Sequence, residues 1–521
     1  MGVVPCPPSL ERQRLQVGGP SWRTPIISSY MASTIPKEIK DIGVTLVGAG
    51  FEAYIVGGCV RDLVLGRTPN DWDITTNAHP EDIQRLFPET FYENKFGTVS
   101  VVTKSKHDQL KVIEVTPFRT DVGYSDRRHP DAVQFARTLE QDLRRRDFTV
   151  NAMAIRLGEN SPVREPKPID LFQGAQDIER KMIRAVGEPA QRFKEDALRL
   201  MRAVRLATTL GFEIEHTTAR AIKDEASLLQ NIASERTRDE LSKLLLADIP
   251  ERGFEMMREL GLLAYVMPEL EEGWGIGQNK HHIYTVWEHN LRALRCAADK
   301  KWPLEVRMAA LLHDVGKPRA KEGDGPDSTF YNHEVIGAKM TWRMLNRLKF
   351  PKEFAEKVTK LVRYHLFYYN VGEVSESSVR RLIRQVGAED MEDLIRVRIC
   401  DRIGSGVPKA EPYKLRHFRF LVEKLSRDPI SVGMLRVDGA DVMRIADIPP
   451  GPKVGFLLNI LLEEVLDDPA LNKKAYLEDR LLQLAHMTDE ELKALADEAK
   501  KKKIALEEAE IGEIKKKHWV K

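Results

Sequence analysis

Two aspartates and a glycine pair near the start of the chain are the first residues whose spacing could support chemistry. The chain reads V-G-G-C-V-R-D around Gly57 and Gly58, and N-D-W-D around Asp71 and Asp73. Glycines lack a Cβ atom, so the backbone can turn sharply there and bring its N–H groups to a phosphate. Asp71 and Asp73 lie two residues apart on an expected strand, so both carboxylates emerge on one face. Paired carboxylates repel each other, but they suit Mg²⁺, which prefers hard oxygen ligands and substrate phosphates.

This pair predicts transfer of a nucleotidyl group from a triphosphate, since two Mg²⁺ ions can activate a hydroxyl and stabilise a leaving pyrophosphate. Glu114, in the expected strand KVIEVTPF, is a candidate third carboxylate. A glycine pair alone is usually a turn, and an isolated D-x-D pair often occurs by chance. A strand, a glycine pair, a helix and then a strand-borne D-x-D resemble the polymerase-β-like nucleotidyltransferases.

A second set of residues in the C-terminal half combines histidines with aspartates. Its members are His289, His313, Asp314, Lys317, His333, His365 and Asp401. Neutral imidazole and carboxylate are ligands of Mn, Fe, Ni or Zn, and an adjacent H-D pair on a helix resembles the HD-type phosphohydrolases.

The resemblance implies one divalent transition metal on His289, His313, Asp314 and Asp401. It implies a possible second metal on His333 and His365, and a phosphate contact at Lys317. The alternative is an HD fold that serves only as an RNA-binding scaffold.

The elements that position the first set alternate between strands and helices from Ile35 to Arg156. EAYIVGG reads as a buried strand, VRDLVLG as a short helix and DWDITT as a strand, while TVSVVTK and KVIEVTPF read as pairing strands. From about Pro189 the strand signals vanish, and segments such as FKEDALRLMRAVRLATTLGF show apolar residues at helical spacing. We therefore predict an α+β fold with an all-helical remainder.

Composition places few limits on function. A chain of 521 residues is too long for a single hydrophobic core, so about two to four domains are expected. The 81 lysines and arginines nearly balance 79 aspartates and glutamates, so composition alone does not indicate a nucleic-acid binder. Four scattered cysteines (Cys6, Cys59, Cys296 and Cys400) fit a reducing cytosol. The sequence contains no apolar run of about 18 residues, so no membrane-spanning helix is predicted.

Together with four further motifs, the glycine and aspartate motif resembles those of the bacterial-type, class II tRNA nucleotidyltransferases, the CCA-adding enzymes related to bacterial poly(A) polymerases. In the family's order, the glycine and aspartate motif is followed by R-R-D-F-T-V-N-A, I-D-L-F-Q-G-A-Q-D-I, E-D-A-L-R and E-R-T-R-D-E-L. The resemblance is strong from about Lys37 to Leu246 and looser beyond. It implies a nucleotidyltransferase head of the polymerase-β type, a helical neck, an HD domain and C-terminal helices.

The motif E-D-A-L-R offers a way to choose a base. Asp196 and Arg199 are three residues apart on an expected helix and should face the same way. Asp196 can only accept hydrogen bonds and Arg199 can only donate them. Cytosine and adenine each offer an amino donor beside a ring-nitrogen acceptor and fit this pair, whereas uracil and guanine do not. An ordinary intrahelical ion pair is the alternative.

The resemblance also implies further contacts with the nucleotide. Gly57, Gly58 and Arg61 are expected to hold the triphosphate. The other expected nucleotide-binding residues are Arg146, Asp147, Asn151, Arg202 and Arg205. The segment Phe118 to Arg128 corresponds to a flexible loop of members that add the full CCA, so it favours that activity over CC addition.

The predicted domains have the following bounds. They are a disordered extension at 1–34 with Met31 as an alternative start, the head at 35–180, the neck for base selection and RNA binding at 181–250, the HD-type domain at 251–425, a helical segment at 426–490 and a charged tail, helical or disordered, at 491–521.

Together with the resemblance, these residues predict a cytoplasmic, Mg²⁺-dependent enzyme that adds C, C and A to the 3′ end of tRNA from CTP and ATP and releases pyrophosphate. It binds no membrane, and its oligomeric state is not predicted. The resemblance also implies a possible metal-dependent phosphohydrolase activity of the HD domain. A bacterial poly(A) polymerase, a CC-adding enzyme and an HD phosphohydrolase with a relic head remain alternatives.

Overall fold

The computed structural model of the chain describes residues 34–93, 97–122, 132–158, 167–279, 283–367, 369–372, 374–406, 411–426 and 432–520. Residues 1–33 of the predicted N-terminal extension and residues 123–128 of the predicted flexible loop lie outside the described residues. The chain divides into two compact units, Met1–Thr359 and Lys360–Lys521, and each is considered by itself. The domain bounds given above stay predictions.

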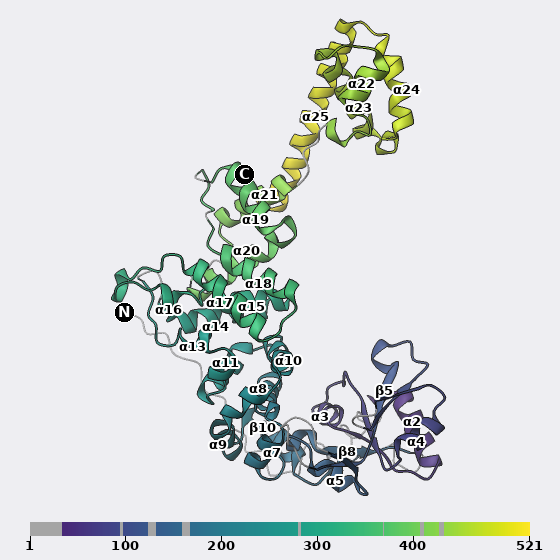
Figure 1. The fold of residues 1–521 in the computed structure, drawn as a ribbon, viewed down its shortest axis with the longest axis vertical. Coiled ribbons are helices and arrows are strands. Elements are labelled where there is room, and N and C mark those ends of the chain that lie inside the picture. Colours follow the sequence, from purple (N-terminus) through teal and green to yellow (C-terminus); the bar gives the residue numbers. More distant parts are fainter. Residues whose placement is uncertain are drawn as a thin grey trace, which may run out of the picture. The chain divides into compact units, whose positions relative to one another are not determined.

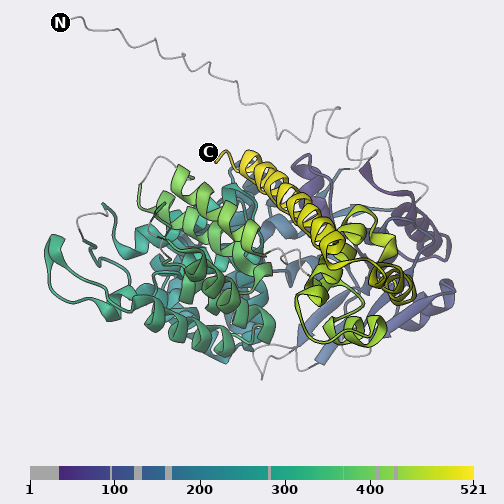
Figure 2. The same ribbon diagram turned by 90° about the horizontal axis from the view of Figure 1, so that it is seen from above.

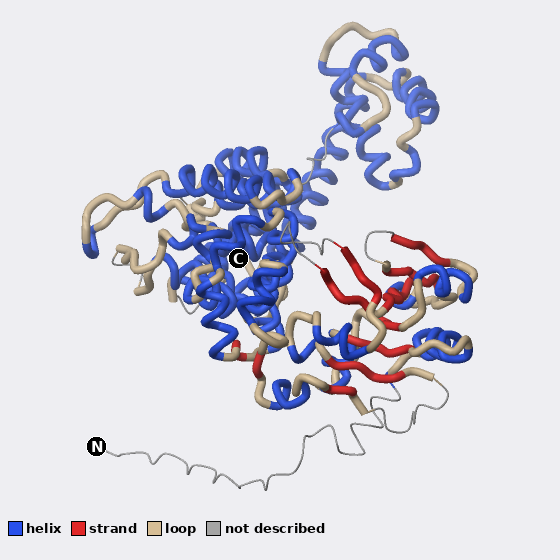
Figure 3. The backbone as a smooth tube through the Cα atoms, turned by 60° about the horizontal axis from the view of Figure 1, so that its bottom comes forward, coloured by secondary structure: helices blue, strands red, loops and turns tan. Residues whose placement is uncertain are grey.

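A mixed seven-stranded sheet forms the N-terminal part of the first unit (Figures 1 and 3). Its order is β3 (Thr90–Glu93), β4 (Thr98–Val102), β5 (Val112–Pro117), β2 (Asp73–Thr76), β1 (Ala53–Val56), β8 (Met153–Arg156) and β9 (Ile169–Asp170). Only β2 and β5 pair in parallel, and the other neighbours are antiparallel. The predicted α+β fold and the predicted pairing of TVSVVTK with KVIEVTPF are confirmed.

Short helices line this sheet. In α2 (Lys37–Gly48), Ile39, Ile42 and Leu46 recur at helical spacing and are fully or almost fully buried. All four residues of β1 are buried, as expected for a central strand. The helix α3 (Gly58–Val64) follows β1 directly, and α4 (Pro80–Leu86) and α5 (Leu139–Arg144) complete the set.

Helices follow from Pro189, but the expectation of no further strands is wrong at one place. The strand β11 (Glu213–Ile214) pairs in parallel with β10 (Met182–Ile183). Each strand has two residues, too few to produce an alternating pattern in the sequence. Around them lie α7 (Pro189–Glu195), α8 (Leu198–Leu210), α9 (His216–Asp224), α10 (Ser234–Leu245) and α11 (Pro250–Glu259).

The rest of the first unit is built on α14 (Val286–Asp299), α15 (Leu304–Leu312) and α17 (His333–Arg347), with the short α16 (Lys317–Ala320) between the last two. A capping box starts α14, since the Thr285 side chain accepts from the Glu288 N–H and Glu288 accepts in return. The helix α18 (Lys352–Tyr364) contains the boundary between the two units.

The second unit continues with α19 (Glu376–Val386), α20 (Met391–Gly404) and α21 (Tyr413–Ser426). A separate apolar core joins α22 (Gly439–Ala446), α23 (Pro452–Asp467) and α24 (Lys474–Ala485). The charged tail predicted as helical or disordered belongs to one continuous helix, α25 (Asp489–Lys517), drawn in yellow in Figure 2. Leu492 and Ala496 of α25 are buried in that core, so this helix is packed rather than fully solvated at its start.

Candidate functional site

The predicted pair of carboxylates lies at the start of β2. Asp73 begins the strand, whereas Asp71 precedes it, so the expectation that both lie on the strand is wrong for Asp71. Exposure still alternates, with Asp71 and Asp73 open to solvent and Trp72 buried between them. Both carboxylates are therefore on the same face. Glu114 pairs with Asp73 in register on β5, so a third carboxylate stands beside them.

The electrostatics at the start of β2 favour a bound cation. The surrounding protein displaces water from the carboxyl group of Asp73 and thereby raises its pKa, and the charge of Asp71 adds to the effect. The guanidinium of Arg146 acts in the opposite direction. A cation bound here would relieve the repulsion between Asp71 and Asp73, and carboxylate oxygens are ligands that Mg²⁺ accepts.

Gly57 faces these carboxylates and leaves little room for a side chain. Its φ of 83° lies in the left-handed region, which glycine adopts without strain. A Cβ atom at this position would lie 3.0 Å from Nη1 of Arg146 and 3.6 Å from Oδ2 of Asp73. The glycine turn, Arg146 and Asp73 are thus immediate neighbours, and α3 starts at Gly58 next to them.

A continuous chain of hydrogen bonds joins four of the predicted nucleotide-binding residues. Nη1 of Arg61 donates to Oδ1 of Asn151 at 2.8 Å, and Nδ2 of Asn151 donates to Oδ1 of Asp147 at 3.3 Å. Nε and Nη2 of Arg202 donate to Oδ2 of Asp147 at 2.9 and 2.5 Å. Burial alone would raise the pKa of Asp147, but Arg202 outweighs it and holds the pKa far below its usual value.

The chain of contacts continues into the neck through a residue that the sequence did not single out. Glu240 on α10 is almost fully buried and accepts from Nε of Arg205 at 2.7 Å, with Nη1 of Arg202 at 3.9 Å. Arg205 is therefore held by Glu240. The pairing spans 35 positions, so nothing in the local pattern could have revealed it.

The helix predicted through Asp196 is interrupted, and that expectation is wrong. The segment forms α7 and α8, and Asp196 lies between them with extended backbone angles (φ −141°, ψ 103°). Its Oδ1 accepts from the N–H of Leu198 at 3.1 Å. Aspartate side chains compete in this way with helical backbone hydrogen bonds, so the helix breaks although the apolar periodicity continues.

The carboxylate of Asp196 is held by Arg236 of α10, a second residue that the sequence did not single out. Nη1 and Nη2 of Arg236 donate to Oδ1 and Oδ2 of Asp196 at 3.1 and 2.8 Å. This two-pronged contact fixes the plane of the carboxylate. Arg236 belongs to the motif E-R-T-R-D-E-L, but its partner could not be read from that motif.

Arg199 makes no intrahelical pair with Asp196. Its Nη1 donates to Oε2 of Glu195 at 2.6 Å and to the carbonyl of Arg192 at 2.9 Å. Its Nη2 donates to the carbonyl of Arg145 at 3.2 Å, which ties the start of α8 to the motif containing Arg146 and Asp147. Arg199 therefore forms an ion pair with Glu195, four residues earlier in the same motif, and not with Asp196. Because Glu195 ends α7 and Arg199 lies in α8, this contact joins two helices and is not the intrahelical pair of the alternative.

Arg145 and Arg146 both contact a fully buried aspartate, Asp142. Two nitrogens of Arg145 donate to Oδ1 of Asp142, at 3.0 and 2.9 Å, and Nη2 of Arg146 donates to Oδ2 at 3.3 Å. Burial raises the pKa of Asp142, but the two arginines outweigh it and lower the pKa. Asp142 thus positions Arg146 beside Gly57, a role that the sequence did not indicate.

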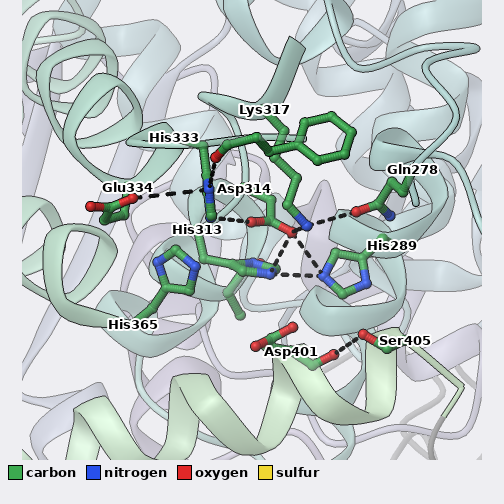
Figure 4. A network of polar contacts seen from close by, with 12 residues as sticks. Gln278, His289, His313, Asp314, Lys317, His333, Glu334, His365, Asp401 and Ser405 are labelled. Carbon is green, nitrogen blue, oxygen red and sulfur yellow. Dashed lines mark hydrogen bonds and ion pairs between the residues drawn. The ribbon is translucent and has the colours of Figure 1, made fainter. Parts of the chain in front are cut away.

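The five members of the second predicted set that belong to the first unit lie close together (Figure 4). Oδ2 of Asp314 lies 3.1 Å from Nε2 of His289 and 3.3 Å from Nε2 of His313, and the two Nε2 atoms are 2.9 Å apart. Oδ1 of Asp314 lies 3.3 Å from Nε2 of His333. Burial acts to raise the pKa of Asp314, but Lys317 and His313 hold it well below its usual value.

The histidine rings are oriented as metal ligands usually are. Nδ1 of His313 lies 2.8 Å from the carbonyl of Ala310, and Nδ1 of His333 lies 2.7 Å from that of Phe330. A ring that donates through Nδ1 is a tautomer whose Nε2 carries a lone pair, and metal-ligating histidines commonly have this arrangement. Both Nε2 atoms point to Asp314, so these residues fit a divalent cation.

Lys317 and a residue missed from the sequence complete this centre. Nζ of Lys317 forms an ion pair with Oδ2 of Asp314 at 2.6 Å and donates a hydrogen bond to Oε1 of Gln278, also at 2.6 Å. The Gln278 amide is itself held, since its Nε2 donates to the carbonyls of Tyr284 and Thr285. Gln278 therefore fixes the lysine predicted to contact phosphate.

His365 and Asp401 belong to the second unit, where both are buried. Nδ1 of His365 lies 2.7 Å from the carbonyl of Val362, the same arrangement as in His313 and His333. Asp401 on α20 accepts from Nη1 of Arg398 at 2.5 Å. Their participation in the metal centre stays a prediction.

Three family models match the chain. Residues 53–184 match a poly(A) polymerase head domain, residues 211–273 a probable RNA- and SrmB-binding site of polymerase A, and residues 286–403 an HD domain. Nucleotidyltransferase heads and HD domains are generally metal-dependent. No helix among the residues that the structure describes is long and apolar enough to cross a membrane.

Relatives with assigned functions are similar to large parts of the chain. It is 47% identical over 234 residues to the CCA-adding enzyme of Lactiplantibacillus plantarum, a match covering 45% of this chain and 54% of that enzyme. The match to the Geobacillus stearothermophilus CCA-adding enzyme is 44% over 272 residues, or 51% and 60%. These two alignments thus span little more than half of each relative.

Two further comparisons cover more than four fifths of this chain. The CCA-adding enzyme of Geobacillus kaustophilus is 34% identical over 435 residues, covering 82% of this chain and 91% of that enzyme. Among solved structures, the Bacillus stearothermophilus CCA-adding enzyme in complex with CTP is similar with a TM-score of 0.55 and 29% identity. That similarity covers 86% of this chain and 98% of the other.

Proposed function

The chain belongs to the family of CCA-adding enzymes, as its 34% identity over 435 residues shows, and we propose that it has their activity. It adds C, C and A in turn to the 3′ end of tRNA, taking them from CTP and ATP. Each step forms a bond from the terminal RNA hydroxyl oxygen to the α-phosphorus. The bond to the β-phosphate oxygen breaks, and pyrophosphate leaves.

One observation carries this proposal. The helix α8, which would help to choose the base, contacts the motif R-R-D-F-T-V-N-A, which would hold the sugar. Arg199 of α8 donates to the Arg145 carbonyl, and Arg202 donates to Asp147. Arg146, next in sequence, lies beside Gly57 and Asp73. A nucleotide can thus span from the carboxylates to Asp196 along one connected surface.

Asp71 and Asp73, with Glu114 beside them, are proposed to hold Mg²⁺, which when bound supplies positive charge to the reacting phosphate. The glycine turn at Gly57 and Gly58 gives the triphosphate close access to backbone N–H groups. Arg61 adds a guanidinium, and its bond to Asn151 links the triphosphate end to the ribose end. These residues bind and orient the substrate for in-line attack.

Base choice is proposed to rest on Asp196 and Arg199. Each carboxylate oxygen has two lone pairs, so Asp196 can accept from a base amino group while Arg236 still holds it. Arg199 donates to the ring nitrogen beside that amino group. Uracil and guanine would place a carbonyl against Asp196 and an N–H against Arg199, which leaves buried polar groups unpaired.

Incubation of tRNA lacking its CCA end with CTP alone, with ATP alone and with both tests the activity. The proposal expects C incorporation from CTP and complete CCA only with both. Absence of C incorporation contradicts it. Continued A addition without any C identifies a poly(A) polymerase, and two Cs without a following A identify a CC-adding enzyme.

A second activity is favoured by the histidine geometry. We propose that the HD centre binds divalent transition metal and hydrolyses phosphate esters, with His289, His313, Asp314 and Asp401 as ligands. His333 and His365 are proposed for a second ion. The HD family model runs from 286 to 403 and so includes all six residues. The Nδ1 atoms of His313, His333 and His365 each lie 2.7 or 2.8 Å from a backbone carbonyl, an arrangement common in metal-ligating histidines.

Elemental analysis of purified protein tests this second activity, followed by assays with a phosphate monoester and a 2′,3′-cyclic phosphate. A bound transition metal that His313→Ala removes, together with hydrolysis that the same change abolishes, is the expected result. A wild-type protein that binds no such metal would support the scaffold alternative. The cytoplasmic location stays a prediction.

A further inference from the structure

A pocket beside α19 in the second unit takes no part in either proposed activity. It encloses about 450 Å³, which lies within the range of about 300–1,000 Å³ typical of ligand sites. Its lining residues are Phe367, Val374, Ser378, Val379, Arg381, Leu382, Gln385 and Phe418. All of them belong to the unit Lys360–Lys521.

The pocket has an apolar floor and a polar rim. Phe367 and Phe418 are buried, and their rings stack with centroids 4.6 Å apart. Val379 on α19 is 1% exposed and closes the floor from the side of that helix. The rim is formed by Ser378, Arg381 and Gln385, which are exposed and recur at helical spacing along one face of α19.

The rim carries positive charge that is not already neutralised. The helix α19 has three arginines and one glutamate, Glu376, and that glutamate accepts from Arg380 at 3.2 Å and from Lys424 at 2.7 Å. Within the described part of the chain, no carboxylate forms an ion pair with Arg381 or with Arg384, one turn further on. Both guanidiniums are exposed and available to an anion.

We propose that this pocket binds one unpaired nucleotide of the RNA substrate, with the base in the apolar floor and the adjoining phosphates on Arg381 and Arg384. This proposal rests on the proposed activity, which makes RNA the partner. An unstacked base offers an apolar face joined to an anionic backbone, and proteins commonly take such bases into aromatic pockets flanked by arginine. Arginine also suits phosphate because its planar fork donates two parallel hydrogen bonds.

The pocket is distant in sequence from the residues that select and join nucleotides, so its effect should fall on RNA binding alone. It would recognise an unpaired position of a folded RNA and leave a regular duplex unaffected. Contacts with phosphates alone would not distinguish a folded RNA with an unpaired nucleotide from a regular duplex, because both have a phosphate backbone.

Binding of two RNAs tests the proposal. One is tRNA lacking its CCA end, and the other is a blunt-ended RNA duplex in which every nucleotide is paired. Three full-length variants are compared with the wild type: Ser378→Trp, which fills the pocket, Arg381→Ala, which removes its charge, and Arg380→Ala. The last is a matched control, since Arg380 is exposed on the same helix but does not line the pocket.

Ser378→Trp and Arg381→Ala are expected to weaken tRNA binding about tenfold, as loss of one base contact does, and to raise KM for tRNA with kcat unchanged. Both should bind the duplex as the wild type does, and Arg380→Ala should weaken tRNA binding less than about twofold. Unchanged tRNA binding in Ser378→Trp, or equal losses for both RNAs, overturns the pocket proposal. A benzophenone side chain at position 378 provides a second measurement, since it should crosslink to an unpaired nucleotide.

Failure of the pocket proposal is distinguishable from failure of the proposed activity. If the wild type adds CCA but the variants bind tRNA normally, only the pocket proposal is wrong. If the wild type adds no nucleotide to any RNA, the proposed activity itself is wrong.

Discussion

Asp196 depends on a partner 40 positions away in the sequence. Arg236 holds both oxygens of its carboxylate, and the N–H of Leu198 fixes one of them further. Arg199 is held in a similar way by Glu195 and by two backbone carbonyls. The two side chains proposed to read the base are therefore set before a nucleotide arrives, which lowers the cost of ordering them on binding.

Arg236→Met is expected to loosen this arrangement. Hydrogen bonds to charged groups are worth about 1.5–3 kcal/mol, so kcat/KM for C addition should fall about 10- to 100-fold. Incorporation of U and G relative to C should rise, because the carboxylate is no longer fixed. Single-nucleotide extension assays with each triphosphate measure both effects.

The control for this change is Arg238→Met on the same helix, since Arg238 contacts Asp239 and the Lys349 carbonyl instead of Asp196. Equal selectivity in Arg236→Met and in the wild type contradicts a positioning role for Arg236.

Gly57→Ala is expected to disable the nucleotidyl-transfer site. The new methyl group would lie 3.0 Å from Arg146 and 3.6 Å from Asp73, and displacement of catalytic groups by about 1 Å can cost about 100-fold in rate. Gly66→Ala is the matched control, because Gly66 also has a positive φ, of 70°, but no atom lies within 4 Å of its added Cβ.

Both alanine variants should lose about 1–3 kcal/mol of unfolding free energy, because each places an L-residue at a positive φ. Pyrophosphate release and thermal unfolding, measured on the same preparations, separate the two effects. Full activity in Gly57→Ala would show that the glycine is needed only as a turn.

At the scale of elements, the sequence predicted the parts whose patterns are local. β1, β2, β4 and β5 were expected from their apolar or alternating residues. The two-residue strands β10 and β11 were missed, because pairing of so short a segment depends on distant chain. The break at Asp196 was missed because the apolar spacing of α8 continues through it.

In the candidate sites too, the residues that belong to local motifs were predicted, whereas their distant partners were not. Residue types and motifs indicated Asp71, Asp73, His313 and Asp314. The partners that hold such groups in place, namely Asp142, Arg236, Glu240 and Gln278, were not predicted. Each of the last three lies 35 or more positions from the side chain that it fixes, and a single sequence gives no local signal for such contacts.

The start of α9 provides a test of how a pKa affects stability. Glu215 caps this helix by accepting from the N–H groups of Thr217 and Thr218. Burial acts to raise its pKa, but these bonds and the Thr217 hydroxyl outweigh it and lower the pKa to about 2, from a usual 4.5. A carboxyl group with a lowered pKa stabilises the fold above its unfolded-state pKa, and this contribution is lost as pH falls through the folded value.

Glu215→Gln should therefore reduce the unfolding free energy at pH 7 by about 1 kcal/mol, the usual worth of a helix cap. The difference from the wild type should stay constant down to about pH 4.5 and shrink progressively toward pH 2. Urea denaturation at several pH values measures it. Asp224→Asn, at the other end of α9, is the control, and an identical pH dependence in that variant contradicts the assignment.

At the scale of the whole molecule, the chain carries two centres with different chemistry. Asp71 and Asp73 of the first centre lie at the start of the interior strand β2 and are exposed, which suits a metal that arrives with a triphosphate. The histidines of the second are almost fully buried, which suits a resident metal. The two centres share no residue, so their activities should be separable by mutation.

Asp71→Asn is expected to abolish CTP incorporation and to leave hydrolysis of phosphate esters unchanged. His313→Ala is expected to have the opposite effect and to lose bound transition metal. Parallel assays on both variants provide reciprocal controls. Loss of both activities in either variant, with folding intact, would contradict independent centres.

The central claim is that protein side chains choose the base without a template. The most direct measurement incubates tRNA lacking its CCA end with equal concentrations of all four triphosphates and sequences the 3′ ends made by the wild type and by Asp196→Asn. The account predicts ends of C-C-A for the wild type, and a loss of C and A relative to U and G for the variant. Frequent U or G in wild-type products, or an unchanged product distribution in Asp196→Asn, would contradict it.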